Sequence, residues 1–187
     1  MRIEETGLPG CRLVNGGRSV DARGSFFKTF HRDVFAAAGL RTDWAEAYCS
    51  TSVRDVVRGM HFQLPPTDHA KLVFCTAGQV LDVVLDLRRG SPTYGQYRAF
   101  QLDDQAGAGV YIPSGCVHGF LSLSASSTMQ YDVTSVHSPS HDAGISWAGF
   151  GLEWPVERPV MSERDRNHPP LADFDTPFSF DPEAPAR

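Results

Sequence analysis

The stretch GVYIPSGCVHGFLSLS, from Gly109 to Ser124, decides the fold of this 187-residue chain. Two short apolar segments, GVYI and GFLSLS, lie on either side of a Pro-Gly turn. Pro113 and Gly115 suit a tight turn, and the Val, Ile, Tyr and Phe residues around them suit β-strands. The stretch therefore predicts two strands joined by a turn, with His118 at the edge of the core.

Similar segments recur along the chain, separated by Gly, Pro, Asp and Ser, at the spacing typical of a β-sandwich or barrel. They cover residues 71–78, 79–88, 94–102 and 128–135. Only residues 32–40 favour a helix, because Asp33 suits its first turn and Gly39 its end. Prolines are frequent after Trp154, which predicts loops around the barrel, a short helix near residues 162–167 and a loose tail from about 172 to 187. We expect one domain over residues 1–187.

Composition excludes several classes of function. The formal charge of -5 gives no general attraction for nucleic acid or membranes, and no apolar run approaches the length of a membrane span. The N-terminus lacks the pattern of a secretory signal. Cys11, Cys49, Cys75 and Cys116 form no CxxC pair, which predicts reduced, mostly structural thiols. We expect a cytoplasmic protein.

The spacing of Pro113, Gly115 and His118, P-x-G-x-x-H, resembles the second motif of the cupin superfamily, whose fold is a double-stranded β-helix, or jelly roll. Many cupins bind a metal with this His, an HxH pair and a Glu. Here the earlier region offers only His61 and His69, with no Glu between them and the next glycine. A metal site needs three or four convergent ligands, so we expect no metal and no other cofactor.

A more specific resemblance comes from the order of four blocks. They are RGMHFQ at 58–63, KLVFCTAGQVLDVVLDLRRGSPTYGQY at 71–97, YIPSGCVHGF at 111–120 and SERDRN at 162–167. In this order, from about residue 23 to 167, they resemble the dTDP-4-dehydrorhamnose 3,5-epimerase family. That resemblance implies an all-β cupin jelly roll that inverts C3 and C5 of a nucleotide-linked 4-keto-6-deoxyhexose without a metal or redox cofactor. It also implies a homodimer, in which residues near 23–30 reach into the neighbour's site.

The implied chemistry needs a base, an acid on the opposite face of the sugar and a partner for the enolate oxygen. His61 is the candidate base, because an unperturbed imidazole can be neutral at working pH. The resemblance implies that Asp165 bonds the other ring nitrogen, that Lys71 stabilises the enolate, and that Tyr131 returns the proton. Each also has a purely structural alternative: a core histidine, a surface carboxylate, an exposed strand-edge cation and a core tyrosine.

The resemblance also implies a set of substrate-binding positions. They are Arg23, Lys28, Glu46, Tyr48, Arg58, Gln63, His118, His137 and Asp142. The forked guanidinium groups of Arg23 and Arg58 suit a diphosphate, although Arg58 has the alternative of pairing with a carboxylate. Asp82 is a candidate support for the lysine and histidine of the catalytic set, or the partner in a strand-terminal hydrogen bond.

Several of these positions depart from the family pattern. Lys28 replaces a Glu, Glu46 and Tyr48 stand in a Gln-Asp-Asn stretch, His137 replaces a Tyr, and Asp142 replaces a Glu. An ammonium group only donates hydrogen bonds and suits an acceptor such as cytosine N3, which suggests an altered base preference, with CDP as a candidate. Alternatively, Lys28 points to solvent or phosphate and dTDP still binds.

Four functions therefore remain open. The main one is a 3,5-epimerase. The others are a single-centre 3- or 5-epimerase acting on a non-dTDP sugar, such as a CDP or GDP sugar, a sugar 3,4-ketoisomerase, and a nucleotide-sugar-binding or metal-sensing cupin without turnover.

Overall fold

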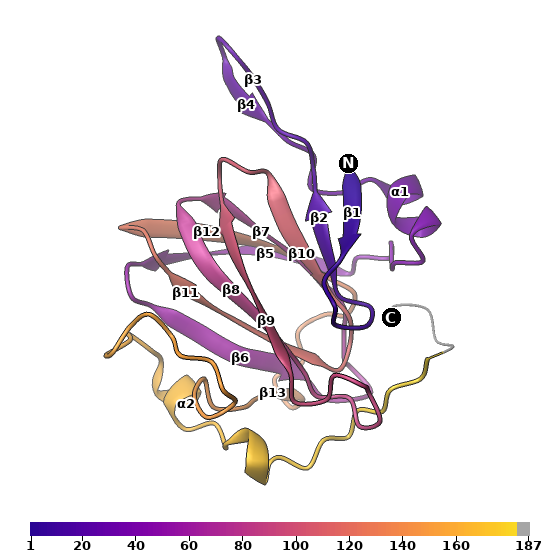
Figure 1. Cartoon of the computed structure of the whole chain (residues 1–187), viewed down its shortest axis with the longest axis vertical. Coiled ribbons are helices and arrows are strands. Elements are labelled where there is room, and N and C mark those ends of the chain that lie inside the picture. The colour runs from indigo at the N-terminus through magenta and orange to yellow at the C-terminus, as the bar shows by residue number, and fades with distance from the viewer. Residues whose placement is uncertain (183–187) are drawn as a thin grey trace.

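Two antiparallel sheets face each other in the computed structural model, which describes residues 1–182 (Figure 1). One sheet contains, in spatial order, β1 (Arg2–Glu5), β2 (Arg12–Asn15), β10 (Ala108–Ile112), β7 (Lys71–Ala77), β12 (Ser126–Val133) and β5 (Glu46–Val53). The other contains β13 (Asp142–Gly144), β6 (Val57–Gln63), β11 (Cys116–Ser122), β8 (Gln79–Asp86) and β9 (Tyr97–Asp103). The predicted all-β architecture is confirmed.

The core lies between the two sheets and follows the apolar patterns of the strands. Every residue of β11 is buried, since this strand lies between β6 and β8 in its sheet. Val84 and Phe120 from this sheet pack against Val73 and Met129 from the other. Burying each such side chain contributes about 1.5–3 kcal/mol. Aliphatic and aromatic side chains from the inner faces of both sheets thus form the core.

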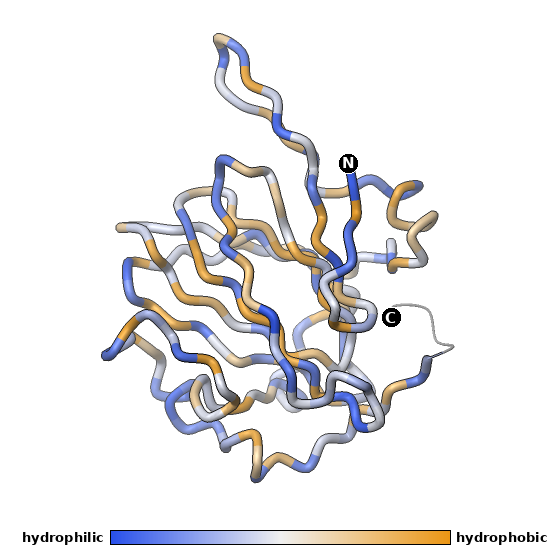
Figure 2. Tube along the Cα trace, in the orientation of Figure 1, coloured by the Kyte–Doolittle hydropathy of each residue, from blue (hydrophilic) through white to orange (hydrophobic). Residues whose placement is uncertain are grey.

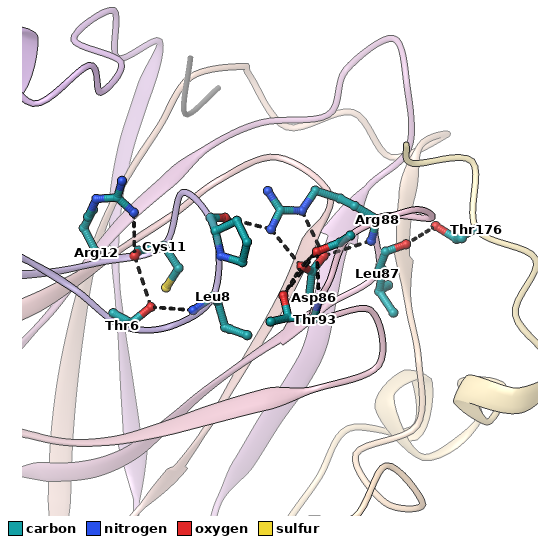
Figure 3. A network of polar contacts seen from close by, with 11 residues as sticks. Thr6, Leu8, Cys11, Arg12, Asp86, Leu87, Arg88, Thr93 and Thr176 are labelled. Atoms are coloured by element: carbon teal, nitrogen blue, oxygen red, sulfur yellow. Dashed lines mark hydrogen bonds and ion pairs between the residues drawn. The ribbon is translucent and has the colours of Figure 1, made fainter. Parts of the chain in front are cut away.

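The predicted strands are present, although several of their ends are shifted by up to three residues. Strand β9 begins at Tyr97, because the residues before it form a turn around the buried carboxylate of Asp86. Asp86 accepts hydrogen bonds from the hydroxyl groups of Ser91 and Thr93, at 2.6 and 2.8 Å, and pairs with Arg88 (Figure 3). Arg88 also donates to the backbone oxygen of Pro9, which ties the N-terminal loop to this end of the barrel.

Two short helices accompany the sheets. Helix α1 spans Arg32–Ala37, three residues shorter than predicted, because Gly39 takes a φ of 70° and ends it. Helix α2 spans Glu163–Arg166, where a short helix was predicted, and the hydroxyl of Ser162 caps it by accepting from the backbone N–H of Asp165 at 3.1 Å. A 3-10 turn follows at Leu171–Asp173. Among the described residues, none of the helices has the length and apolar character needed to cross a membrane.

The prediction of a loose tail from residue 172 was wrong for the residues up to 180. The side chain of Phe178 is buried in the core cluster that contains Phe62. Thr176 donates to the backbone oxygen of Leu87 at 2.7 Å. The backbone N–H of Arg89 donates to the backbone oxygen of Phe178, and its own backbone oxygen accepts from the N–H of Phe180. No local pattern indicates this packing, because the partners Leu87 and Phe62 lie far earlier in the chain. Residues 183–187 of the predicted tail lie outside the described part.

A hairpin of β3 (Ser19–Asp21) and β4 (Gly24–Phe26) extends away from the barrel (Figure 1). Its apolar side chains do not reach the core: Val20 and Phe26 are 65% and 64% exposed. Figure 2 shows apolar and charged residues side by side along this hairpin. Such exposed apolar side chains on a projecting element are typical of a contact surface.

Candidate active site

A cavity of about 370 Å³ opens between the two sheets. Strands β5, β6, β7, β11 and β12 all contribute to its wall, together with β13, helix α2 and two loops. The lining residues are Glu46, Tyr48, Ser50, Arg58, His61, Phe62, Gln63, His69, Lys71, His118, Phe120, Tyr131, Val133, His137, Asp142 and Arg164. Most residues of the predicted site therefore lie around one space.

His61 and Asp165 form a pair at this cavity. The Nε2 atom of His61, on β6, donates to Oδ1 of Asp165, on α2, at 2.9 Å. Asp165 is buried, and its Oδ2 accepts from the backbone N–H of Gly59 at 3.2 Å. These contacts fix the carboxylate and orient the imidazole. The other ring nitrogen, Nδ1, has no hydrogen-bond partner in residues 1–182, so it is available for proton transfer.

The charge states of this pair suit a general base. Burial lowers the pKa of His61 below its ordinary 6.5, although the hydrogen bond that His61 donates to Asp165 opposes this effect. Burial alone would raise the pKa of Asp165, but the hydrogen bond and charge of His61 outweigh it and bring that pKa well below its usual range. At neutral pH the imidazole is therefore neutral and the carboxylate ionised, as proton abstraction requires.

Arg164 is a cavity residue that the sequence analysis missed. Its Nη2 atom lies 3.0 Å from Nε2 of His61, its Nε donates to Asp165 at 3.3 Å, and its Nη1 pairs with Asp142. The signal was present, because Arg164 precedes Asp165 in the SERDRN block and shares its short helix. It brings a positive charge to the mouth of the cavity.

The ring of His168 packs edge-on against His61, with centroids 5.8 Å apart, and its Nε2 lies 3.9 Å from Oδ1 of Asp165. These three side chains offer ligand atoms within 4.8 Å of one another. However, the guanidinium of Arg164 already contacts His61 and Asp165 at this place. A bound metal ion would have to displace that cation.

Lys71 begins β7 and is buried, with 7% of its surface exposed. Its Nζ donates to the backbone oxygen of His61 at 3.1 Å. Burial lowers the pKa of Lys71 from 10.5 to about 8, against the charges of Asp142 and Asp82, which raise it. At neutral pH the group is mostly an ammonium in a poorly solvated place, where its electrostatic effect on a nearby oxyanion is large.

Tyr131 lies on β12, in the sheet opposite to the one that carries His61. Its ring stacks on Tyr48, with centroids 4.8 Å apart and an interplanar angle of 14°, and meets the ring of His118 edge-on at 6.0 Å. Burial raises the pKa of Tyr131 well above its ordinary value, so the phenol keeps its proton. The cavity thus holds a neutral base on one sheet and a phenolic acid on the other.

Seven of the nine predicted substrate-binding residues line the cavity: Glu46, Tyr48, Arg58, Gln63, His118, His137 and Asp142. Several are held by their neighbours. Glu46 accepts from the backbone N–H of His137 at 2.8 Å, and the Oε1 of Gln63 accepts from that of Ser138 at 2.6 Å. Arg58 donates to the hydroxyl of Ser52 rather than to a carboxylate.

Asp82 and His118 form a second buried pair, at 2.7 Å between Oδ2 and Nε2. Asp82 thus accepts its hydrogen bond from His118 and not from Lys71. It supports Lys71 only through its negative charge, which raises the pKa of the lysine. Asp82 therefore holds His118 in place in the cavity wall.

The other two predicted binding residues, Arg23 and Lys28, do not line this cavity. Arg23 lies on the projecting hairpin, where it pairs with Asp21, and Lys28 is exposed just after the hairpin. Neither side chain lines the cavity of its own chain.

Apart from Arg164, five lining residues were missed: Ser50, Phe62, His69, Phe120 and Val133. The apolar ones read as ordinary core residues, and nothing in their pattern separates a cavity wall from a packed interior. His69 had been considered only as a metal ligand. Burial lowers its pKa to about 3, so it stays neutral across the physiological range.

Comparisons with known proteins agree with this geometry. A model of the family described as dTDP-4-dehydrorhamnose 3,5-epimerase matches residues 5–173. The dTDP-4-dehydrorhamnose 3,5-epimerase of Mycolicibacterium smegmatis is 39% identical over 175 residues, which cover 92% of this chain and 87% of the relative. The dTDP-4-dehydrorhamnose 3-epimerase of Streptomyces niveus is 38% identical over 170 residues, covering 89% of this chain and 82% of that protein.

Solved structures lead to the same family. NovW, a 4-keto-6-deoxy sugar epimerase from the novobiocin cluster of Streptomyces spheroides, superposes with a TM-score of 0.89 at 38% identity, covering 92% of this chain and 88% of that chain. The RmlC epimerase of Mycobacterium tuberculosis gives a TM-score of 0.87 at 37% identity, covering 92% and 90%. The predicted cupin jelly roll is confirmed, and the chain belongs to the dTDP-4-dehydrorhamnose 3,5-epimerase family of isomerases.

Proposed function

We propose that the protein is an epimerase that inverts C3, C5 or both in a nucleoside-diphosphate-linked 4-keto-6-deoxyhexose, by way of an enolate. The observation that carries this proposal is the placement of four groups around one cavity: the His61 and Asp165 pair on one sheet, Tyr131 on the other, and the buried ammonium of Lys71 beside them. Membership of the family supports the same reaction class.

In the first step, neutral His61 removes the proton from a carbon next to the C4 ketone, and the C–H electron pair moves to form the enolate. The negative charge collects on the C4 oxygen, where the Lys71 ammonium stabilises it. Asp165 stabilises the imidazolium that forms. Tyr131 then gives its proton to the opposite face of the same carbon, which inverts the centre. Exchange with solvent returns the proton to the phenol and removes it from His61.

Deuterium exchange tests this function. Candidate NDP-4-keto-6-deoxy sugars are incubated with the protein in D₂O, and C3 and C5 are followed by NMR. Label should enter one or both carbons, and the variant His61→Asn should abolish it. A shift of the carbonyl from C4 to C3 would instead show a ketoisomerase. A protein that binds the sugar with no label entering would be a binding module, and this result would refute the proposal.

The regiochemistry depends on which carbon meets both His61 and Tyr131. The relatives include proteins named as 3,5-epimerases and as a 3-epimerase, at 39% and 38% identity, so similarity does not choose between them. The same NMR experiment does, since it reports label at each carbon separately.

For the nucleotide part of the substrate, we propose an altered base preference, with CDP as the first candidate. The support is chemical: Lys28 is an exposed donor where the family pattern has an acceptor, and Glu46 and Tyr48 occupy cavity positions where the family pattern has amides. Calorimetric titration with dTDP, CDP, GDP and UDP tests this. Clearly tightest binding of dTDP would refute the altered preference and leave the epimerase proposal intact.

We further propose a homodimer. The hairpin projects away from the barrel with Val20 and Phe26 exposed, and β5 lies at the edge of its sheet, where among the described residues it pairs with β12 alone. Arg23 and Lys28 lie outside their own cavity, so a role in binding requires that they reach a second copy. Light scattering should give twice the chain mass, and a monomer at micromolar concentration would refute the dimer. The four free thiols suit a reducing, cytoplasmic setting, which is where we place the protein.

A further inference from the structure

Tyr48 is the direct cross-strand partner of Tyr131. The two residues face each other in the register of β5 and β12, and on its other side Tyr131 faces Val73 of β7. Val73 is fully buried, and the edge of the His118 ring meets the Tyr131 ring. Tyr48, Val73 and His118 therefore surround the ring of Tyr131 on three sides, and Tyr48 covers the side toward the sheet edge, because β5 is the edge strand.

The contact between the two rings is specific. Their centroids are 4.8 Å apart and their planes differ by 14°, which is an offset stack rather than a chance approach. Tyr131 is 6% exposed, whereas Tyr48 is 42% exposed. Tyr48 thus shields Tyr131 from solvent and meets solvent itself.

We propose that Tyr48 is a positioning residue: its ring fixes the phenol of Tyr131 over the sugar and keeps water from it. The inference rests on the proposed epimerase function, in which Tyr131 is the proton donor. Proton transfer slows when the donor is displaced by about 1 Å from its productive position. Proton removal by His61, which lies on the opposite sheet, does not depend on the ring of Tyr48.

The electrostatics agree with a shielding role. Burial dominates the high pKa of Tyr131, and Tyr48 is among the neighbours that raise it further. Burial, followed by the charges of Glu46 and Asp142, raises the pKa of Tyr48 itself to about 12. Both phenols are therefore neutral at working pH, so Tyr48 acts through packing rather than as a competing charge.

The first test separates inversion from exchange. Tyr48→Ala removes the stack, Tyr48→Val also removes it but keeps a strand-forming side chain, and Tyr48→Phe keeps it. Tyr94→Ala is the matched control, because Tyr94 is 45% exposed and lies outside the cavity. In D₂O we expect Tyr48→Ala and Tyr48→Val to slow inversion on the order of tenfold while label still enters at the carbon that His61 deprotonates. Tyr94→Ala should match the parent, and Tyr48→Phe, which keeps the stack, should keep the parent's ratio of inversion to label exchange.

The second test asks whether Tyr48 acts through Tyr131. In a Tyr131→Phe background, Tyr48→Ala should add no further loss of inversion, since the donor is already absent. Equal loss of exchange and inversion in Tyr48→Ala and Tyr48→Val, or a full additional loss in the Tyr131→Phe background, would overturn the proposal and assign Tyr48 a general structural role.

A third readout does not require turnover. Fluorotyrosine is incorporated, and the ¹⁹F signal of Tyr131 is assigned by its absence in Tyr131→Phe. Its shift difference between H₂O and D₂O, which reports contact with solvent, should grow in Tyr48→Ala and Tyr48→Val, because the phenol becomes solvated, and stay small in Tyr48→Phe, which keeps the ring. An unchanged difference in Tyr48→Ala and Tyr48→Val would overturn the proposal. If the parent protein exchanged no label, the epimerase function would fail, and this signal would still decide whether Tyr48 holds Tyr131.

Discussion

Replacing Lys71 by methionine should make the protein more stable and far less active. The side chain is buried, and burial lowers its pKa from 10.5 to about 8. At 1.36 kcal/mol for each pKa unit, holding the charged form in the folded protein costs about 3 kcal/mol. Methionine has a similar length and no charge, so it removes this cost. It also loses the hydrogen bond to the backbone oxygen of His61, worth about 1 kcal/mol.

The balance is a gain of about 2 kcal/mol in the free energy of unfolding at pH 7, or roughly 4–8 °C in melting temperature for a chain of this size. The pH dependence gives the sign. Below pH 8 the lysine is protonated in both states and the full cost is present. As the pH rises from about 8 to 10.5, the folded protein releases this proton before the unfolded chain does, so the cost disappears. The advantage of Lys71→Met should therefore shrink over this range.

Activity should move the other way, with kcat lower by about 10²–10³, since the enolate loses one preorganised charge. Urea unfolding at pH 7 and pH 10, and deuterium exchange of the sugar at pH 7, measure the two effects. Lys28→Met is the stability control, because Lys28 is the other lysine of the chain and is exposed. A Lys71→Met protein that is no more stable than the parent, with kcat within tenfold, would falsify this reasoning.

Three further predictions concern the pH profile, the dyad and the C-terminal segment. The profile of kcat/KM should be a bell with an acid limb below 6.5, set by the lowered pKa of His61, and an alkaline limb near 8, set by Lys71. A rate that stays constant below pH 6.5 would contradict the assignment of His61, and one that stays constant above pH 8 would contradict that of Lys71. Asp165→Asn should lower kcat on the order of 10³–10⁴, because the imidazolium loses its counter-charge, and a loss below tenfold in stopped-flow or NMR rates would exclude the dyad. Phe178→Ala should destabilise the fold by about 3 kcal/mol in urea unfolding, whereas the exposed Val160→Ala should change it little.

The strands of the barrel could be predicted because their signal is local. Residues 71–77 and 116–122 alternate with turns that contain Gly or Pro, and both became buried strands. The block around His61 could likewise be placed, since its residue types and order resemble one family. Such patterns report only on residues that are neighbours in the chain, which was sufficient to predict the strands; the roles of the candidate catalytic residues stay a prediction.

The missed features depend on contacts between distant parts of the chain. The C-terminal segment packs because Thr176 and Phe178 meet Leu87 and Phe62, about 90 to 115 residues earlier. The stack of Tyr48 on Tyr131 follows from the pairing of two strands far apart in sequence, which no local pattern reveals. Arg164 was overlooked for another reason: its charge reads as a surface residue until the helix places it beside His61.

The protruding β3 and β4 hairpin separates this protein into two parts that can be changed independently. The proposed reaction groups His61, Lys71 and Tyr131 lie on strands β6, β7 and β12 of the barrel. Arg23 and Lys28 instead lie on or just after a hairpin whose residues are exposed. Mutational libraries confined to residues 19–26 and Lys28, which leave the contact of Phe27 with Phe74 intact, should therefore retain folding while sampling new nucleotide recognition, a favourable starting point for engineering catalysts of unusual deoxysugars.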